Sequence, residues 1–103
     1  MKNIRMMMDY QCYPIWIYDE KGDLICNDLP AELKNENEIG DILDHIQTVY
    51  DSLFVDDEIQ FGYQGFADET AKREFEKNVL KVLGLIESKV GKLYKIENRI
   101  DID

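Results

Sequence analysis

The sequence predicts an α+β fold, in which two amphipathic helices cover one face of a mostly antiparallel sheet of about five strands. Three strand-like segments precede the first helix, whereas a wound parallel sheet would alternate strands and helices from its start. Two longer segments repeat apolar residues every three or four positions, and an alternating segment closes the chain. The expected order is β-β-β-α-β-α-β, and a chain of 103 residues is expected to fold as a single domain over positions 1–103.

The first strand is expected at residues 2–8, where Ile4, Met6 and Met8 would share one face. The next two strands are expected to form a β-hairpin between residues 14 and 26, because the first is aromatic and β-branched and the second is aliphatic. Residues 19–22, Asp-Glu-Lys-Gly, lie between them. An Asp opens a type I turn and a Gly takes the positive φ that follows it, so this segment predicts the turn of the hairpin.

The two cysteines are expected to be free. The turn places Cys26 opposite Trp16, and Cys12 then lies four residues further along, about 13 Å away at ~3.3 Å per residue. A disulfide needs its two Cα atoms within roughly 7 Å of each other. We therefore expect two mostly buried thiols that behave as small apolar side chains.

The first long helix is expected after residue 35, ending near residue 54. Its apolar side chains recur at helical spacing within an arc of about 140°. They are Ile39, Ile42, Leu43, Ile46, Val49, Tyr50, Leu53 and Phe54. Asp41, Asp44, His45 and Asp51 project from the opposite side, so this helix is expected to present an acidic face to solvent.

The second half of the chain predicts a strand, a helix and a final strand. Residues 59–66 alternate, with Phe61 and Tyr63 on one face, as expected for a half-buried strand. The second helix is expected from residue 69 to about residue 90, with Asp68 as its N-cap and Gly91 at its C-terminal end. Residues 93–102 alternate again and supply the last strand.

The charge is negative and unevenly distributed. The net charge is −10, and residues 35–71 contain ten Asp or Glu and no Lys or Arg. The rest of the chain holds twelve acids and twelve bases, so the whole excess lies in this acidic window. A field of one sign repels nucleic acid and anionic membranes and attracts basic partners. We therefore expect a basic protein partner and no direct binding of nucleic acid or membrane.

A cytoplasmic location is expected. No apolar run approaches the ~20 residues of a membrane span. Asp9 interrupts the first apolar stretch before it reaches the length of a signal-peptide core.

The sequence lacks the combinations of residues that catalysis or metal binding requires. His45 is the one histidine and lies among acids on the polar side of a helix. Ser52 and Ser88 have no partner base, and neither Cys has a plausible His. Zinc needs about four tightly spaced Cys or His ligands, and the acidic residues 56–58 lack the loop pattern of a calcium site. We expect no enzyme activity, no cofactor and no metal.

The N-terminal stretch carries a family resemblance. Asp9-Tyr10-x-Cys12-Tyr13-Pro14-x-Trp16, together with Tyr50-Asp51 near the end of the first helix, resembles a pattern in small acidic immunity proteins. These proteins accompany LXG-type polymorphic toxins in Gram-positive bacteria. The resemblance implies that the chain binds and inhibits one toxin domain, and it transfers no catalytic residues.

The leading hypothesis is an immunity-type protein that binds a cationic toxin domain and blocks its active site. The residues expected to bind the partner are the acids Asp41, Asp44, Asp51, Asp56, Asp57 and Glu58 and the aromatic anchors Tyr10, Tyr13 and Trp16. Two alternatives stay open. One is a nucleic-acid mimic that inhibits a DNA-binding enzyme, and the other is a small regulatory or structural domain without a toxin partner. No oligomeric state is predicted.

Overall fold

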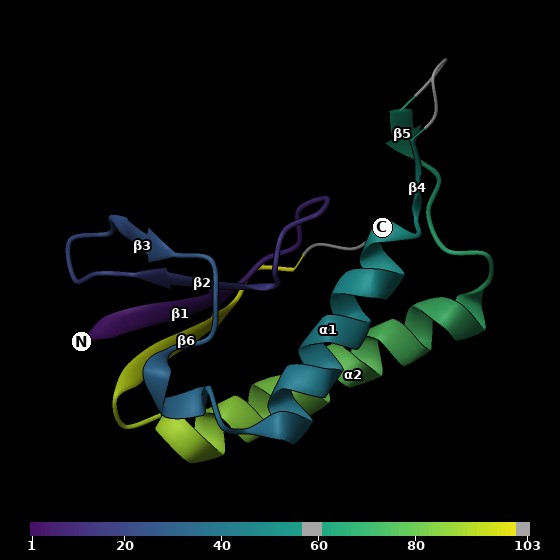
Figure 1. Ribbon diagram of the computed structural model, residues 1–103. Helices are drawn as coiled ribbons and strands as arrows, with labels where there is room; N and C mark the ends of the chain where they lie inside the picture. The colour runs from purple at the N-terminus through teal and green to yellow at the C-terminus, as the bar shows by residue number, and fades with distance from the viewer. Residues whose placement is uncertain (57–60, 101–103) are drawn as a thin grey trace.

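A four-stranded sheet and two helices form the body of the protein, and a separate two-stranded hairpin extends from it (Figure 1). The computed structural model describes residues 1–56 and 61–100. Its elements are β1 (Lys2–Met6), β2 (Ile15–Tyr18), β3 (Leu24–Cys26), the 3₁₀ helix η1 (Ala31–Leu33), α1 (Asn37–Asp51), β4 (Phe54–Asp56), β5 (Phe61–Tyr63), α2 (Glu69–Val90) and β6 (Tyr94–Asn98). The predicted α+β class is confirmed.

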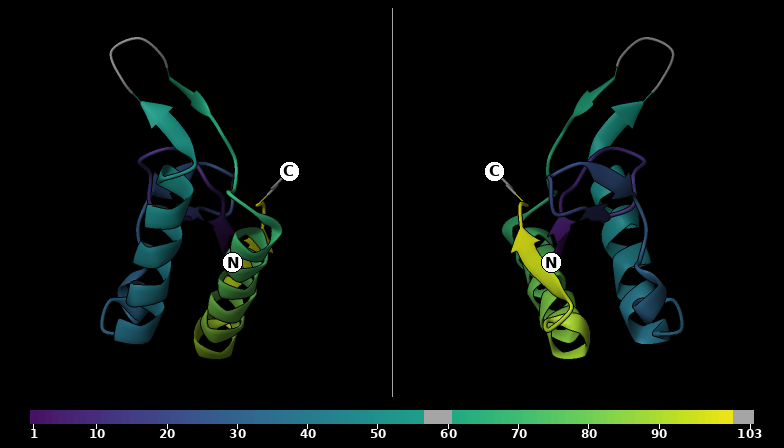
Figure 2. Two further views of the ribbon diagram at one scale, coloured as in Figure 1. Left: turned by 90° about the vertical axis from the view of Figure 1, so that its right-hand side faces the viewer. Right: turned by 90° about the vertical axis from the view of Figure 1, so that its left-hand side faces the viewer.

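The sheet has the strand order β3-β2-β1-β6. β2 pairs antiparallel with both β1 and β3, and β6 pairs parallel with β1, so the last strand of the chain lies beside the first. Both helices lie on the same side of this sheet and pack against each other (Figure 2). The mostly antiparallel sheet with helices on one face is therefore as predicted.

The core lies between the sheet and the helices. Because successive side chains of a strand point to opposite faces, Ile4 and Met6 of β1 and Ile15 and Ile17 of β2 all face the helices and are buried. The helices contribute one apolar stripe each, from Ile39, Leu43 and Ile46 of α1 and Phe75, Val79, Val82, Ile86 and Val90 of α2. Burying each of these side chains stabilises the fold by roughly 1.5–3 kcal/mol.

The predicted hairpin turn is present. Gly22 has φ 91°, and the Gly22 N–H donates to the Asp19 carbonyl at 3.1 Å. The register differs by one residue from the expected one, since Cys26 pairs with Ile17 and not with Trp16. An irregularity between Ile17 and Tyr18 shifts the pairing. Both cysteines are free, as predicted, although they are half-buried and not fully buried.

The two ends of α2 lie where the sequence predicted them, whereas α1 ends earlier than predicted. Asp68 caps α2, because its Oδ1 accepts a hydrogen bond from the Ala71 N–H at 2.8 Å, and Gly91 ends the helix as predicted. α1 ends at Asp51, a few residues before the expected end, because Phe54 begins β4. Neither helix in the described part combines the length and apolar character needed to cross a membrane.

The strand expected at residues 59–66 is shorter and pairs elsewhere. β5 covers residues 61–63 and pairs antiparallel with β4, which was not predicted as a strand. Residues 59 and 60 lie outside the described part, as do residues 101–103 at the end of the expected last strand. The β4–β5 hairpin stands apart from the main sheet, beyond the C-terminal end of α1 (Figure 1). The main sheet consequently has four strands.

Candidate partner-binding surface

The outer face of α1 is acidic, and within the described part of the chain no cation pairs with its exposed aspartates. Asp41 and Asp44 are exposed, opposite the buried stripe of the helix. All twelve Lys and Arg lie in residues 1–56 and 61–100, and the ion pairs found there involve neither Asp41 nor Asp44. These two carboxylates therefore carry uncompensated charge on the surface.

Asp51 is the last residue of α1, and its side chain binds a loop that is distant in the sequence. Its Oδ1 accepts a hydrogen bond from the Gln11 N–H at 2.8 Å. Gln11 has φ 60°, and it is the one residue other than glycine with a positive φ in the described part of the chain. The loop is closed by bonds from the Met7 N–H to the Pro14 carbonyl and from the Cys12 N–H to the Asp9 carbonyl, both 3.1 Å. The loop of residues 7–14 is thereby fixed against the C-terminal end of α1.

An aromatic cluster forms where this loop, α1 and the hairpin meet. The Tyr10 ring centroid lies 4.9 Å from that of Phe54 and 5.0 Å from that of Phe61. Phe54 also contacts Tyr50 at 5.2 Å, Phe61 at 5.7 Å and Tyr63 at 5.3 Å. Phe61 and Tyr63 keep 59% and 46% of their surface exposed, so the outer side of the cluster faces solvent.

Carboxylates lie beside this aromatic cluster. Burial raises the pKa of Tyr50, and the negative charges of Asp9 and Asp51 raise it further. The same three causes raise the pKa of Cys12. The Cys12 thiol therefore stays protonated at neutral pH, which makes it a weak nucleophile.

Tyr13 is held by internal contacts. Its N–H donates to Asn27 Oδ1 at 3.1 Å, and Asn27 Nδ2 donates to the carbonyls of Tyr13 at 2.6 Å and Ile15 at 2.8 Å. Burial, with smaller effects from Asp44 and Asp28, raises the pKa of Tyr13 to about 12. The ring packs against the core and lies close enough to Asp44 for the carboxylate to affect it.

Trp16 lies on the face of the sheet that the helices leave uncovered. Its neighbours Ile15 and Ile17 are buried under the helices, so the alternation of β2 turns Trp16 to the other side. Its Nε1 donates to the Met7 carbonyl at 3.1 Å. On the same face the Arg5 guanidinium lies 4.1 Å from the centroid of the Tyr18 ring.

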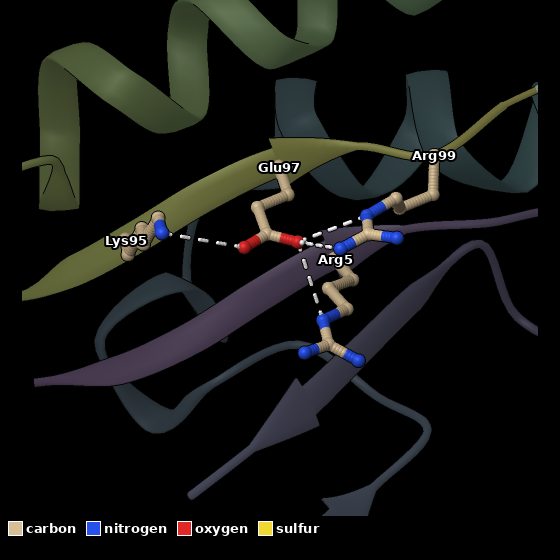
Figure 3. Close-up of polar contacts among 4 residues, drawn as sticks. All are labelled: Arg5, Lys95, Glu97 and Arg99. Carbon is tan, nitrogen blue, oxygen red and sulfur yellow. Dashed lines mark hydrogen bonds and ion pairs between the residues drawn. The ribbon is translucent and has the colours of Figure 1, made fainter. Parts of the chain in front are cut away.

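The cations of this open face are paired with one carboxylate, that of Glu97 on β6 (Figure 3). Glu97 Oε2 lies 2.9 Å from Arg99 Nη2 and 3.3 Å from Arg5 Nε, and Oε1 lies 3.7 Å from Lys95 Nζ. The hydrogen bond from Arg99 lowers the pKa of Glu97, and the charges of Arg99, Arg5 and Lys95 lower it further. These four side chains carry three positive charges and one negative charge, in contrast to the acidic outer face of α1.

Residues 2–99 match the family described as Serratia CdiI immunity protein-like. The chain belongs to this family. It is an immunity protein of a contact-dependent toxin system, a class that neutralises toxins and is generally not enzymatic. No curated protein matches the sequence. The resemblance in the N-terminal stretch is confirmed at the level of an immunity protein, and the LXG type stays a prediction.

Among the residues expected to bind the partner of this immunity protein, those that the structure describes lie at more than one place. Asp51 binds the loop that carries Tyr10 at the end of α1, and the charge of Asp44 is close enough to raise the pKa of Tyr13. Asp41 lies ten residues before Asp51 on the same helix, about 15 Å away along its axis. Trp16 lies on the uncovered face of the sheet.

The acidic turn can be placed only in part. Asp56 is the last residue of β4 and pairs through its backbone with Phe61. Asp57 and Glu58 lie outside the described residues. In the described part of the immunity protein no three His, Cys, Asp or Glu side chains are grouped to hold a metal ion.

Sequence reasoning missed part of the aromatic cluster. Phe61 and Tyr63 were expected on the apolar face of a strand in the main sheet, and Phe54 in the apolar stripe of a helix. Their alternation and spacing indicated that these rings contact other residues. No local signal indicated that Phe54 and Phe61 contact Tyr10, which is more than forty positions away.

Proposed function

We propose that this immunity protein neutralises its cognate toxin by binding a basic surface of the toxin domain with the acidic side of α1 and covering the toxin's active site. One observation carries this proposal. Asp41 and Asp44 are exposed on α1 without a cation partner, although every Lys and Arg of the chain is described. Asp51 extends the same charge to the end of the helix.

The acidic side would act mainly on the rate of association. Exposed carboxylates at the rim of an interface attract a cationic partner over several ångströms and raise the association rate more than the final affinity. Salt screens such charges, since the Debye length falls from about 10 Å at 0.1 M to about 3 Å at 1 M. Complex formation should therefore weaken as the ionic strength rises.

The aromatic residues differ in how available they are to a partner. Tyr10 belongs to the cluster at the hairpin, whose outer side is exposed. Tyr13 and Trp16 have internal hydrogen bonds and are half-buried, so their role as anchors remains part of the proposal without support from their exposure. Asp56, Asp57 and Glu58 are proposed to add to the acidic rim on the basis of sequence alone.

Co-expression with the toxin domain encoded by the neighbouring gene tests the proposal. The immunity protein should restore growth to cells that express the toxin domain, and it should co-purify with that domain at low salt and less at high salt. Growth arrest that persists in the presence of the folded immunity protein would contradict the proposed neutralisation. The toxin's own sequence also decides whether the system is of the LXG type. The immunity protein is proposed to act in the cytoplasm, where such a toxin would meet it.

A further inference from the structure

The β4–β5 hairpin presents the largest group of exposed aromatic rings in the described part of the chain. Phe61 and Tyr63 are 59% and 46% exposed. Phe61 stacks on Phe54 and Tyr63 meets it edge-on, and Phe54 in turn contacts Tyr10 and Tyr50. Other large exposed apolar side chains lie elsewhere and are not aromatic, with Leu24 and Ile25 on β3, Leu80 on α2 and Leu93 in the turn before β6. A two-stranded hairpin is at best marginally stable alone, so these ring contacts hold it while leaving its outer side open.

Two carboxylates neighbour the aromatic cluster, since Asp9 precedes Tyr10 and Asp51 follows Tyr50 in the chain. Asp9 is exposed and accepts a hydrogen bond from the Tyr10 N–H at 2.9 Å, and Asp51 accepts one from the Gln11 N–H at 2.8 Å. No ion pair in residues 1–56 and 61–100 involves either of them. A purely apolar partner that covered the rings would also bury these charges without compensation, which is strongly unfavourable.

An interaction within the protein shows which group can bind an aromatic ring and a carboxylate at the same time. On the open face of the sheet, the Arg5 guanidinium lies over the Tyr18 ring at 4.1 Å while its Nε lies 3.3 Å from a carboxylate oxygen of Glu97. A guanidinium is planar and weakly hydrated, so it stacks on a ring and pairs with a carboxylate at once, which an ammonium does less well.

We propose that the β4–β5 hairpin anchors the toxin by binding an arginine side chain of the toxin. The guanidinium stacks on the exposed rings of Phe61 and Tyr63 and pairs with Asp9 and Asp51. This inference rests on the proposed function, since it names the chemistry of the toxin segment that the immunity protein binds. It adds an anchor of defined type to the acidic rim on α1.

Titration calorimetry of the immunity protein with the neighbouring toxin domain tests the anchor. Phe61→Leu keeps an apolar side chain but removes the π face, and it should weaken binding about fivefold. Phe61→Ala should weaken binding about tenfold or more, as expected for a hot-spot aromatic residue. Leu80→Ala removes an equally exposed apolar side chain from α2 and should change the affinity less than about twofold. Circular dichroism confirms that each variant is folded.

The outcomes separate the anchor from the proposed function. If the wild-type protein binds and neutralises the toxin while Phe61→Leu and Phe61→Ala bind as tightly, the anchor is wrong and the function stands. If only Phe61→Ala weakens binding, the contact is apolar and the guanidinium is wrong. If the wild-type protein does not bind the toxin, both proposals fail. Replacement of single toxin arginines by lysine should reveal one position that weakens binding to the wild-type protein and has no further effect with Phe61→Leu.

Discussion

The carboxylate of Asp51 accepts a hydrogen bond from the backbone N–H of Gln11, forty positions earlier in the chain. This bond joins the last residue of α1 to the loop that carries Tyr10 into the aromatic cluster. The bond between Asp51 and Gln11 therefore connects α1 to the loop whose Tyr10 packs on the β4–β5 hairpin. A change at Asp51 should affect both the stability of the loop and the arrangement of the proposed binding surface.

Asp51→Ala should lower the free energy of unfolding by about 1 kcal/mol, because the Gln11 N–H loses its acceptor. Asp51→Asn removes the charge but keeps an oxygen in place, so it should cost less than Asp51→Ala. Urea unfolding of the three proteins measures the differences. Equal stability of all three would show that the bond contributes nothing to the fold.

Gln11 is expected to respond to substitution according to its backbone conformation. Its φ of 60° suits glycine and disfavours β-branched side chains. Gln11→Gly should leave stability unchanged or raise it by up to about 1 kcal/mol, and Gln11→Val should lower it by more than about 1 kcal/mol. Thermal unfolding gives the order of the three proteins. A Val variant as stable as the Gly variant would mean that the loop does not require this conformation.

Tyr13 should make the fold sensitive to alkaline pH. Its pKa is raised to about 12 in the folded protein, against about 10 in an unfolded chain. The unfolded state therefore loses the phenolic proton first, and stability that is fully present below pH 10 is lost as the pH rises towards 12. Tyr13→Phe should remove up to about 2 kcal/mol of this loss. Unfolding curves at several pH values between 9 and 12 compare the two proteins. Parallel loss in both would contradict the raised pKa.

Glu97 should make the fold sensitive to acid. Its pKa is lowered by the hydrogen bond from Arg99 and by the neighbouring cations, so its contribution is present above the pKa of an unfolded Glu and is lost as the pH falls through the lower folded value. Glu97→Gln should lower the melting temperature at neutral pH. This difference from wild type should shrink as the pH falls below about 4. A constant difference over the whole range would argue against the charge as its cause.

Features set by neighbouring residues could be predicted from the sequence. The turn at residues 19–22 was expected because Asp19 and Gly22 have the required preferences, and Gly22 has the positive φ. Asp68 was expected as an N-cap because it precedes a helical pattern, and it accepts the Ala71 N–H. The exposure of Asp41 and Asp44 followed from the period of α1.

Features set by contacts between distant segments could not be predicted. Alternation showed that Phe61 and Tyr63 share a face, but it does not show whether a helix, another strand or a loop covers that face. In the structure, Phe54 of β4 contacts both rings, and Tyr10 of the loop contacts Phe61. The pairing of Cys26 with Ile17 depends on an irregularity in the ladder that has no clear marker in the sequence.

The central claim is that the acidic side of α1 directs the immunity protein to a basic toxin surface, and its most direct test is the association rate at increasing salt. Asp41 and Asp44 can be replaced together by Asn, with a matched control in which Glu74 and Glu76, on the mixed-charge face of α2, are replaced by Gln. Both double variants lose two negative charges. At low salt the α1 variant should associate about three- to tenfold more slowly than wild type and show a flatter salt dependence, whereas the α2 variant should change less than about twofold. Equal association rates for the two double variants, or a wild-type rate that does not depend on salt, would contradict the claim.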